Sequence, residues 1–323
     1  MVLYKIRDWI DIDSLLITEL CTVKHPGIVS ILKKNPDKID WCMLSENPEA
    51  IELLQQNKDK IVWSNLSSNT NAIYLLEQNQ DKINFGSLSL NTAAINLLEQ
   101  NKDKINWMLL MINTGAIRLI LQNLDNFTPQ NFDFTTPVPP QNFEVIWKNK
   151  IVWKYLSSNS AAVNLLEKNP DKIDWSWLSS NTAPGAIKLL EKNPDKIDWC
   201  WLSSNTAPAA IELLEKNKDK INWINLSANP AAIHLLEQNR DKIDWINLSS
   251  NPAAIHLLER NRDKIDMYSL SINPGIFTYD YYTMKETKKL LHEEIIAYVY
   301  HPSRIEKYLN KGIELDELYL CNA

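Results

Sequence analysis

The side chains able to do acid–base, nucleophilic or metal chemistry are scattered through this sequence rather than gathered in a motif. His234 and His256 lie 22 residues apart, and Cys21, Cys42, Cys200 and Cys321 have neither metal-type nor disulfide-type spacing. There is no Gly-rich phosphate loop, HExxH, CxxC pair or GxSxG. Packed helices lie about 10 Å apart, too far for the two histidines to share a metal ion directly. We therefore expect no catalytic residues, cofactor site or metal site, and no enzyme.

Composition excludes further classes of function. The chain has 323 residues and a net charge of −6, which argues against broad binding of a phosphate backbone. No apolar stretch approaches the roughly 18 residues that span a bilayer. The start, MVLYKIRDWIDID, has charges where a signal peptide needs an apolar core. The sequence thus predicts no nucleic-acid partner, no membrane span, reduced thiols and a cytoplasmic location.

A strong internal sequence repeat sets the secondary-structure elements that position these side chains. A Lys-Ile-Asp, Lys-Ile-Asn or Lys-Ile-Val tripeptide recurs, and an aromatic residue or, once, methionine follows it. Most gaps are 22 residues, two are 24, and one of 46 equals a normal unit plus a distorted one. These core positions are Trp41, Trp63, Phe85, Trp107, Trp153, Trp175, Trp199, Trp223, Trp245 and Met267.

One unit, residues 241–261, predicts two short helices. Asp241 is expected to cap the first helix, with Asp244 close to a capping box. Asn251 and the following proline open the second helix as N-cap and first helical residue. Asn261 is expected to end it in the left-handed conformation. Each helix has about two turns, so stacking on neighbouring units must stabilise both.

The fold class that follows is all-α, an α-solenoid of about ten 22–24-residue helical-hairpin repeats with helical caps. A ladder of core tryptophans is expected to be its buried spine. The glutamates equivalent to Glu77 and the asparagines equivalent to Asn57 are interpreted as caps and ladders that satisfy backbone groups between units.

Four segments are predicted along the chain. Residues 1–127 form an N-terminal cap, an eroded repeat up to about Lys24, and a first array. Residues 128–142 form a Pro-rich interruption, because helix cannot run through its prolines. Residues 143–277 form a second array, and residues 278–323 a C-terminal helical cap.

The unit DKIDWxxLSxNPxAIxLLExN and the tail AYVYHPSRIEKYL resemble repeat proteins encoded in many copies by mimivirus-like giant DNA viruses. The resemblance covers residues 25–277 and the tail. It implies a large, mostly uncharacterised paralogous group with no catalytic residues to carry over. The interruption and the two 24-residue units depart from the even pattern and put uniform curvature in doubt. The architecture also resembles leucine-rich-variant solenoids by analogy.

Two sets of variable positions are candidates for binding a partner. Tyr155, Trp177 and Trp201 come two residues after a core aromatic and predict an exposed aromatic row. The alternative is that the two tryptophans pack on longer loops, because their units contain an inserted Ala-Pro. The second set lies on the other helix, where a solvated face is the alternative interpretation: Lys188, Glu212, His234 and His256.

These patterns favour a non-enzymatic scaffold that binds a host or viral protein in the cytoplasm of an infected cell. The alternative is a structural virion or assembly component without a discrete ligand. The identity of the partner, the face that binds it, the handedness of the solenoid and the oligomeric state do not follow from the sequence.

Overall fold

A computed structural model describes residues 4–123, 152–299, 301 and 305. The chain divides into two units, which we describe separately: Ile6–Ile276, called here the repeat array, and Met1–Lys5 with Phe277–Ala323. The Pro-rich interruption predicted at 128–142, with its two boundaries, lies outside the described residues. So do residues 306–323 of the predicted C-terminal cap.

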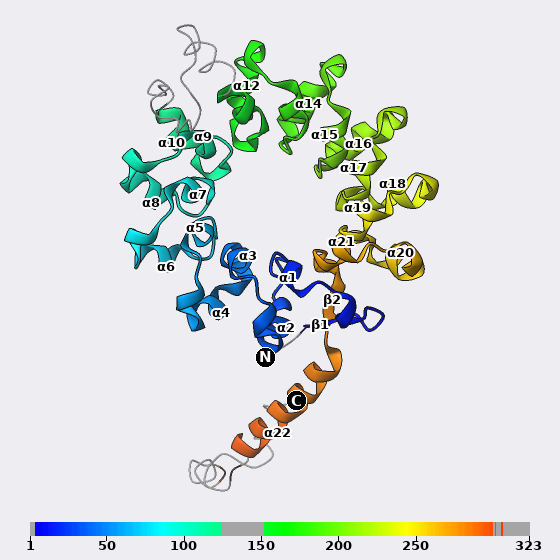
Figure 1. The fold of residues 1–323 in the computed structure, drawn as a ribbon. Helices are drawn as coiled ribbons and strands as arrows, with labels where there is room; N and C mark the ends of the chain where they lie inside the picture. The colour runs from blue at the N-terminus through cyan, green and yellow to red at the C-terminus, as the bar shows by residue number, and fades with distance from the viewer. Residues whose placement is uncertain (1–3, 124–151, 300, 302–304, 306–323) are drawn as a thin grey trace. The chain divides into compact units, whose positions relative to one another are not determined.

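The repeat array is built from two layers of short helices, as the sequence predicts for an all-α repeat fold (Figure 1). Each unit contributes one helix to an inner layer and one to an outer layer. The inner helices are α1 (Ile17–Leu20), α3 (Trp41–Glu46), α5 (Trp63–Leu66), α7 (Phe85–Leu90), α9 (Trp107–Leu110), residues 152–158, α13 (Trp175–Ser179), α15 (Trp199–Ser204), α17 (Trp223–Ser227), α19 (Trp245–Ser249) and α21 (Met267–Ser271). The outer helices are α2 (Ile28–Lys34), α4 (Ile51–Gln56), α6 (Ile73–Glu77), α8 (Ile95–Gln100), α10 (Ile117–Gln122), α12 (Val163–Glu167), α14 (Pro184–Glu191), α16 (Pro208–Lys216), α18 (Ile233–Gln238) and α20 (Ile255–Arg260).

Single 3-10 turns connect these helices. One set carries the Asp-Lys pair before each inner helix: η2 (Pro36–Lys38), η4 (Lys58–Lys60), η5 (Gln80–Lys82), η6 (Lys102–Lys104), η11 (Pro170–Lys172), η12 (Pro194–Lys196), η13 (Lys218–Lys220), η15 (Arg240–Lys242) and η17 (Arg262–Lys264). The other set leads into outer helices or, for the last, ends the array: η3 (Pro48–Ala50), η7 (Thr114–Ala116), η10 (Ser160–Ala162), η14 (Pro230–Ala232), η16 (Pro252–Ala254) and η18 (Pro274–Ile276). A further turn, η1 (Ile12–Ser14), precedes α1.

The helix caps match the sequence in part. Asn251 is an N-cap, since its side chain accepts a hydrogen bond from the backbone N–H of Ala253 at 3.0 Å. The prediction for Asp241 was wrong: α19 is capped by Asp244, which accepts from the N–H of Asn247 at 2.8 Å. A short 3-10 turn takes the place of the first helical turn at Asp241.

The end of the outer helix also differs from expectation. Asn261 has φ −136° and is not left-handed. Its Nδ2 donates instead to the carbonyl oxygen of Leu257 at 2.8 Å, which satisfies one of the free carbonyls at the helix end. Asn57 makes the same bond within its own repeat, to Leu53 at 2.8 Å, so these asparagines cap helices and do not link units.

The core of the array is aliphatic rather than indole. The leucine three residues after each core aromatic is fully buried, as Leu248 shows, and so is the second leucine of the outer helix, Leu258. Most of the core tryptophans are only half-buried, among them Trp245. The expected buried tryptophan spine is thus a spine of leucines, and of the core tryptophans only Trp107 and Trp153 are buried in the described residues.

The lysine of the Asp-Lys pair covers the half-buried indole of the preceding repeat. Lys264 Nζ lies 4.6 Å from the ring centroid of Trp245, and Lys242 lies 4.7 Å from that of Trp223. Such cation–π contacts at exposed sites contribute about 0.5–1 kcal/mol each. The recurrence of Lys one unit after the aromatic residue therefore has a physical basis in the stacking of repeats.

Neighbouring repeats are joined by a buried row of asparagines, six residues after each core aromatic, which we call the amide ladder. Asn229 Nδ2 donates to the carbonyls of Ser203 at 3.0 Å and Asn205 at 2.9 Å in the preceding repeat, while its Oδ1 accepts from Ala231 N at 3.0 Å. The sequence identified these residues only as N-caps. The ladder comprises Asn47, Asn69, Asn91, Asn113, Asn159, Asn181, Asn205, Asn229, Asn251 and Asn273.

The ladder continues across the interruption. Asn159 Nδ2 donates to the carbonyls of Met111 at 2.8 Å and Asn113 at 3.3 Å, although 46 residues separate the two asparagines. The repeats on either side of residues 124–151 are therefore direct neighbours, joined by the same bonds as repeats that follow one another in the chain.

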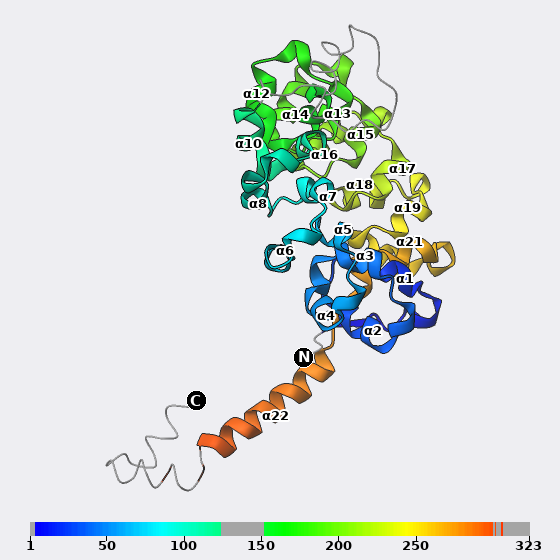
Figure 2. The same ribbon diagram turned by 60° about the vertical axis from the view of Figure 1, so that its left-hand side comes forward.

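The array closes on itself. Helix α1 contacts α21, and the two lie side by side in both views (Figures 1 and 2). The backbone N–H of Leu16 donates to Ser271 Oγ at 2.9 Å. The backbone N–H of Asp266 makes the equivalent bond to Ser249 Oγ, at 3.0 Å, between two consecutive repeats. Ile17 therefore stands where a core aromatic stands in other repeats. A closed array exposes no end face that a cap would have to cover.

Further contacts stabilise the interface between the first and last repeats, which we call the closing interface. Arg7 N donates to the carbonyl of Ile276 at 2.9 Å, and Arg7 Nε donates to that of Gly275 at 2.8 Å. The guanidinium of Arg262 lies 5.4 Å from the ring centroid of Trp9. The N-terminal segment, predicted as an eroded repeat, acts as the neighbour of the last repeat.

The closing interface lacks the amide ladder. The residue equivalent to the ladder asparagine is Val23, which is buried and has no donor for the carbonyls of Ser271 and Asn273. The indole N–H of Trp9 is also buried without an acceptor in the described residues. An unsatisfied buried donor costs about 1–3 kcal/mol. This interface therefore lacks hydrogen bonds that the ladder makes at the other described junctions.

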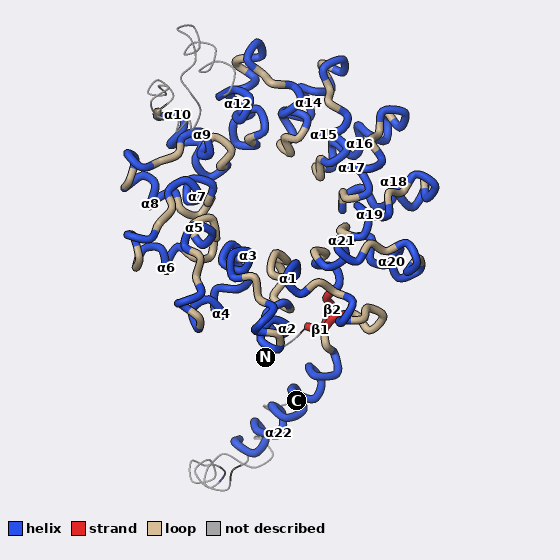
Figure 3. The backbone as a smooth tube through the Cα atoms, in the orientation of Figure 1, coloured by secondary structure: helices blue, strands red, loops and turns tan. Residues whose placement is uncertain are grey.

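Tyr4 and Lys5 of the second unit, with Ile6, form β1 (Tyr4–Ile6), which pairs with β2 (Phe277–Tyr279) in a two-stranded sheet (Figure 3). The rings of Tyr4 and Tyr279 lie 5.0 Å apart. Helix α22 (Tyr281–Val299) follows, within the segment 278–323 that the sequence predicts to be helical.

Replacing a ladder asparagine should destabilise the array strongly. Asn229→Ala leaves two carbonyls and one N–H without partners in a buried site, and we expect a loss of about 3 kcal/mol or more in the free energy of unfolding. Urea unfolding measures it. Asn96→Ala, on the exposed side of α8, is the control and should stay within about 0.5 kcal/mol. Equal effects of the two changes would contradict the ladder.

Restoring the ladder at the closing interface should stabilise the array. Val23→Asn supplies a carboxamide to the carbonyls of Ser271 and Asn273, and we expect a gain of about 1–2 kcal/mol by urea unfolding. The same change at a buried position outside the ladder, Val163→Asn, should destabilise instead. A loss of stability in Val23→Asn would show that this interface differs from the others.

Candidate functional site

The inner helices present one side to the outer layer and the opposite side to the middle of the array. Taking α19 as an example, Leu248 and Ser249 are buried toward the outer layer, while Ile246 and Asn247 lie on the other side. Side chains one and two residues after the core aromatic therefore form the inner face of the array. Figure 1 shows that the inner helices of the described repeats surround the middle of the array.

The predicted aromatic row exists on this face. The ring centroids of Tyr155 and Trp177 lie 5.4 Å apart in an edge-to-face arrangement, and those of Trp177 and Trp201 lie 6.4 Å apart with planes tilted by 31°. Trp201 is 49% exposed, whereas the other two rings are half-buried. The three rings lie on successive inner helices, so repeat stacking fixes their spacing.

The inserted Ala-Pro pairs lie where the connecting segments 180–183 and 205–207 meet the outer helices, and these segments are longer than 250–251 in a unit without the insertion. Pro184 and Pro208 are the first residues of α14 and α16, where the missing N–H has no cost, and these are the longest outer helices of the array. The tryptophan rings of the row contact one another and belong to the inner layer, whereas the insertions belong to the outer layer.

One cation lies within the row. Lys154 Nζ is 5.1 Å from the ring centroid of Trp177. It occupies one face of that ring and places a positive charge beside the aromatic row. A cationic ligand at the same ring would meet electrostatic repulsion.

Three further residues extend this face, and the sequence analysis missed them. Ile224, Ile246 and Tyr268 are 57%, 61% and 54% exposed, on α17, α19 and α21. They occupy the position directly after the core aromatic in three successive repeats. The signal was visible in the sequence as an apolar residue at a variable position, but its exposure depends on how the helix packs.

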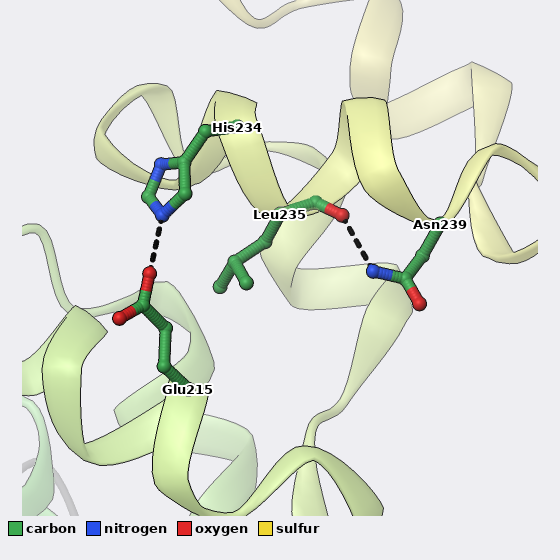
Figure 4. Close-up of polar contacts among 4 residues, drawn as sticks. All are labelled: Glu215, His234, Leu235 and Asn239. Carbon is green, nitrogen blue, oxygen red and sulfur yellow. Dashed lines mark hydrogen bonds and ion pairs between the residues drawn. The ribbon is translucent and has the colours of Figure 1, made fainter.

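The second predicted set lies on the outer layer and does not meet the aromatic row. Lys188 and Glu212 are exposed on α14 and α16. His234 Nε2 lies 2.6 Å from Glu215 Oε1 of the preceding repeat (Figure 4). His256 makes the equivalent contact with Glu237 at 2.7 Å. Each histidine thus pairs with a carboxylate, and an exposed pair of this kind contributes about 0–1 kcal/mol.

In the described part of the array, two titratable groups have pKa values shifted by burial. Burial raises the pKa of the Cys21 thiol, and burial lowers the pKa of the His25 imidazole; both lie in the first repeat, away from the aromatic row. Within the described residues, no group of three or more His, Cys, Asp or Glu side chains could hold a metal ion.

None of the helices in the described part of the chain combines the length and apolar character needed to cross a membrane. A comparison with models of protein families, with curated proteins and with solved structures finds no match to this chain. The inner face is therefore identified as a candidate site from its geometry alone.

Stacking within the row is measurable. A double-mutant cycle of Tyr155→Ala and Trp177→Ala should give a coupling of about 0.5–1.5 kcal/mol in urea unfolding, because the two rings touch edge to face. Tyr155→Ala combined with Tyr74→Ala, on the outer helix α6, should be additive. Zero coupling between Tyr155 and Trp177 would show that the rings are apart in solution.

Proposed function

We propose that this chain is a non-enzymatic scaffold that binds a protein partner on the inner face of its repeat array, with the aromatic row as anchor. The observation that carries this proposal is the exposure of Trp201 at the end of a stack of rings that holds it in place. Large aromatic side chains that are already ordered lose little conformational entropy on binding and are enriched among the residues that dominate interface energies.

The repeat architecture supports the same proposal. Leucines, ladder asparagines and lysines recur because they stabilise the stacking, while the residues after each core aromatic change from repeat to repeat without affecting it. Stacked repeats with variable exposed positions form extended surfaces suited to binding. The resemblance to repeat proteins of giant DNA viruses extends the proposal to a viral protein that acts on a host or viral partner in the cytoplasm of an infected cell.

A photo-cross-linking experiment tests this function. Benzoylphenylalanine in place of Ser204, an exposed residue of α15, is irradiated in cells that make the chain, and cross-linked proteins are identified by mass spectrometry. We expect one discrete partner, and Trp201→Ala should reduce its recovery about tenfold or more, because loss of an anchor exceeds 1.4 kcal/mol.

Two controls make the result specific. Benzoylphenylalanine in place of Asn96, on the outer helix α8, should not capture the same protein, and Tyr74→Ala should leave recovery from position 204 unchanged. Recovery that is indifferent to Trp201→Ala would refute the aromatic anchor. Cross-links only to second copies of the chain would favour the structural or assembly role instead.

A further inference from the structure

The inner face continues beyond the aromatic row as a band of exposed apolar side chains. From α15 to α21 it presents Trp201, Ile224, Ile246 and Tyr268, each about half to three-fifths exposed on a successive inner helix. Contiguous exposed apolar surface of this kind marks interaction sites on folded proteins. We call these four residues the apolar band.

The band is unusual because it carries no charge. The inner helices α13, α15, α17, α19 and α21 contain no Asp, Glu, Lys or Arg, although charged residues make up 23% of the chain. The carboxylates at the start of these helices are the N-caps Asp174, Asp198, Asp244 and Asp266, which accept hydrogen bonds from backbone N–H groups of their own helices. The other charged residues of these repeats lie on the outer layer and in the 3-10 turns.

This charge distribution selects the class of partner. A nucleic acid requires several cations facing its phosphates, and the described inner face from residue 152 to α21 offers only Lys154. A strongly acidic or basic peptide would leave its charges without partners against the apolar band, at a desolvation cost that the band does not offset. An uncharged segment with apolar side chains incurs no such cost.

Polar groups beside the band suit a polypeptide backbone. Asn225 and Asn247 follow Trp201 at the equivalent position on the next two inner helices. Asn225 Nδ2 donates to the carbonyl of Cys200 at 2.9 Å, and Asn247 Nδ2 to Asp244 Oδ1 at 2.9 Å. Within the described residues no donor reaches either carboxamide oxygen, so each can accept from the N–H of a bound segment.

The repeat spacing suits an extended segment. Packed helices lie about 8–10 Å apart, and a polyproline II helix advances about 9.3 Å in one turn of three residues. One turn per repeat would place the same face of the segment on each residue of the apolar band in succession. Aromatic-lined grooves are known to recognise this conformation.

We propose that the apolar band, with Asn225 and Asn247, holds an extended, uncharged segment of a partner protein whose aliphatic, aromatic or prolyl side chains repeat about every third residue. The inference rests on the proposed function and specifies the chemistry of the partner.

Peptide selection on the full chain tests it. A random library of peptides about 16 residues long, displayed on phage, is selected on the immobilised protein. Enriched peptides should be depleted in Asp, Glu, Lys and Arg and enriched in apolar residues and proline. A selected peptide, made with a fluorescent label, should bind the full chain in fluorescence polarisation.

Variants then locate the bound peptide. Ile246→Lys should weaken binding about tenfold or more by placing a charge in the band, while Tyr74→Lys on the outer layer should leave it unchanged. Because Ile246 is exposed, the variant should keep the wild-type circular dichroism and urea midpoint, and Ile246→Ser serves as a second, milder variant.

Three results would overturn the proposal: no enrichment over the starting library, enriched peptides carrying three or more charges of one sign, or binding that neither change at Ile246 affects. The cross-linking experiment tests the scaffold function separately from this inference. A partner captured at position 204 through a charged segment would leave the scaffold function intact and refute only this inference.

Discussion

A buried carboxamide joins each repeat to the one before it, and the remaining architecture depends on this contact. A ladder asparagine such as Asn229 caps the 3-10 turn that leads into its outer helix and satisfies two carbonyls of the neighbouring repeat with the same side chain. Because these groups lie in the interior, losing one partner would leave several polar atoms without hydrogen bonds. The ladder therefore sets the register between repeats with a precision that leucine packing alone would not supply, since apolar contacts are non-directional. It holds even across the segment between residues 123 and 152.

Fixed register has a consequence for shape within the repeat array. Five outer helices follow a 3-10 turn, and two others, α14 and α16, begin at a proline, so the outer layer is extended in these repeats. The last repeat meets the first, where the backbone N–H of Leu16 and Ser271 Oγ form a bond found at other interfaces. Closure replaces two end faces with one more interface. That interface lacks the carboxamide, because Val23 occupies its position, and Arg7 and Arg262 supply other contacts there.

The two layers also divide the chemistry of the surface. From α13 to α21, charged residues lie on the outer helices, in the 3-10 turns and at the N-caps of inner helices. Exposed pairs on the outer layer, such as His234 and Glu215, contribute little to stability. The inner helices from α13 to α21 are uncharged and carry exposed apolar side chains. The stacking of repeats does not require charged residues on one layer and apolar residues on the other, since both the outer and the inner exposed positions face away from the core. The proposed binding of a partner on the inner face would bury these apolar residues, which are otherwise in contact with water.

The sequence by itself determined the all-α repeat class, the 22-residue register, the Asn-Pro helix start and the presence of the row formed by Tyr155, Trp177 and Trp201. Each of these depends on periodicity or on local hydrogen bonding within a few residues, which a single chain records directly. Tertiary structure alone decided the role of the amide ladder, the half-exposure of the core tryptophans, the pairing of His234 with Glu215 and the closure between α1 and α21. These features depend on groups from different repeats meeting in space. A residue type such as asparagine is equally compatible with a local cap and with a bond to the neighbouring repeat until the packing is known.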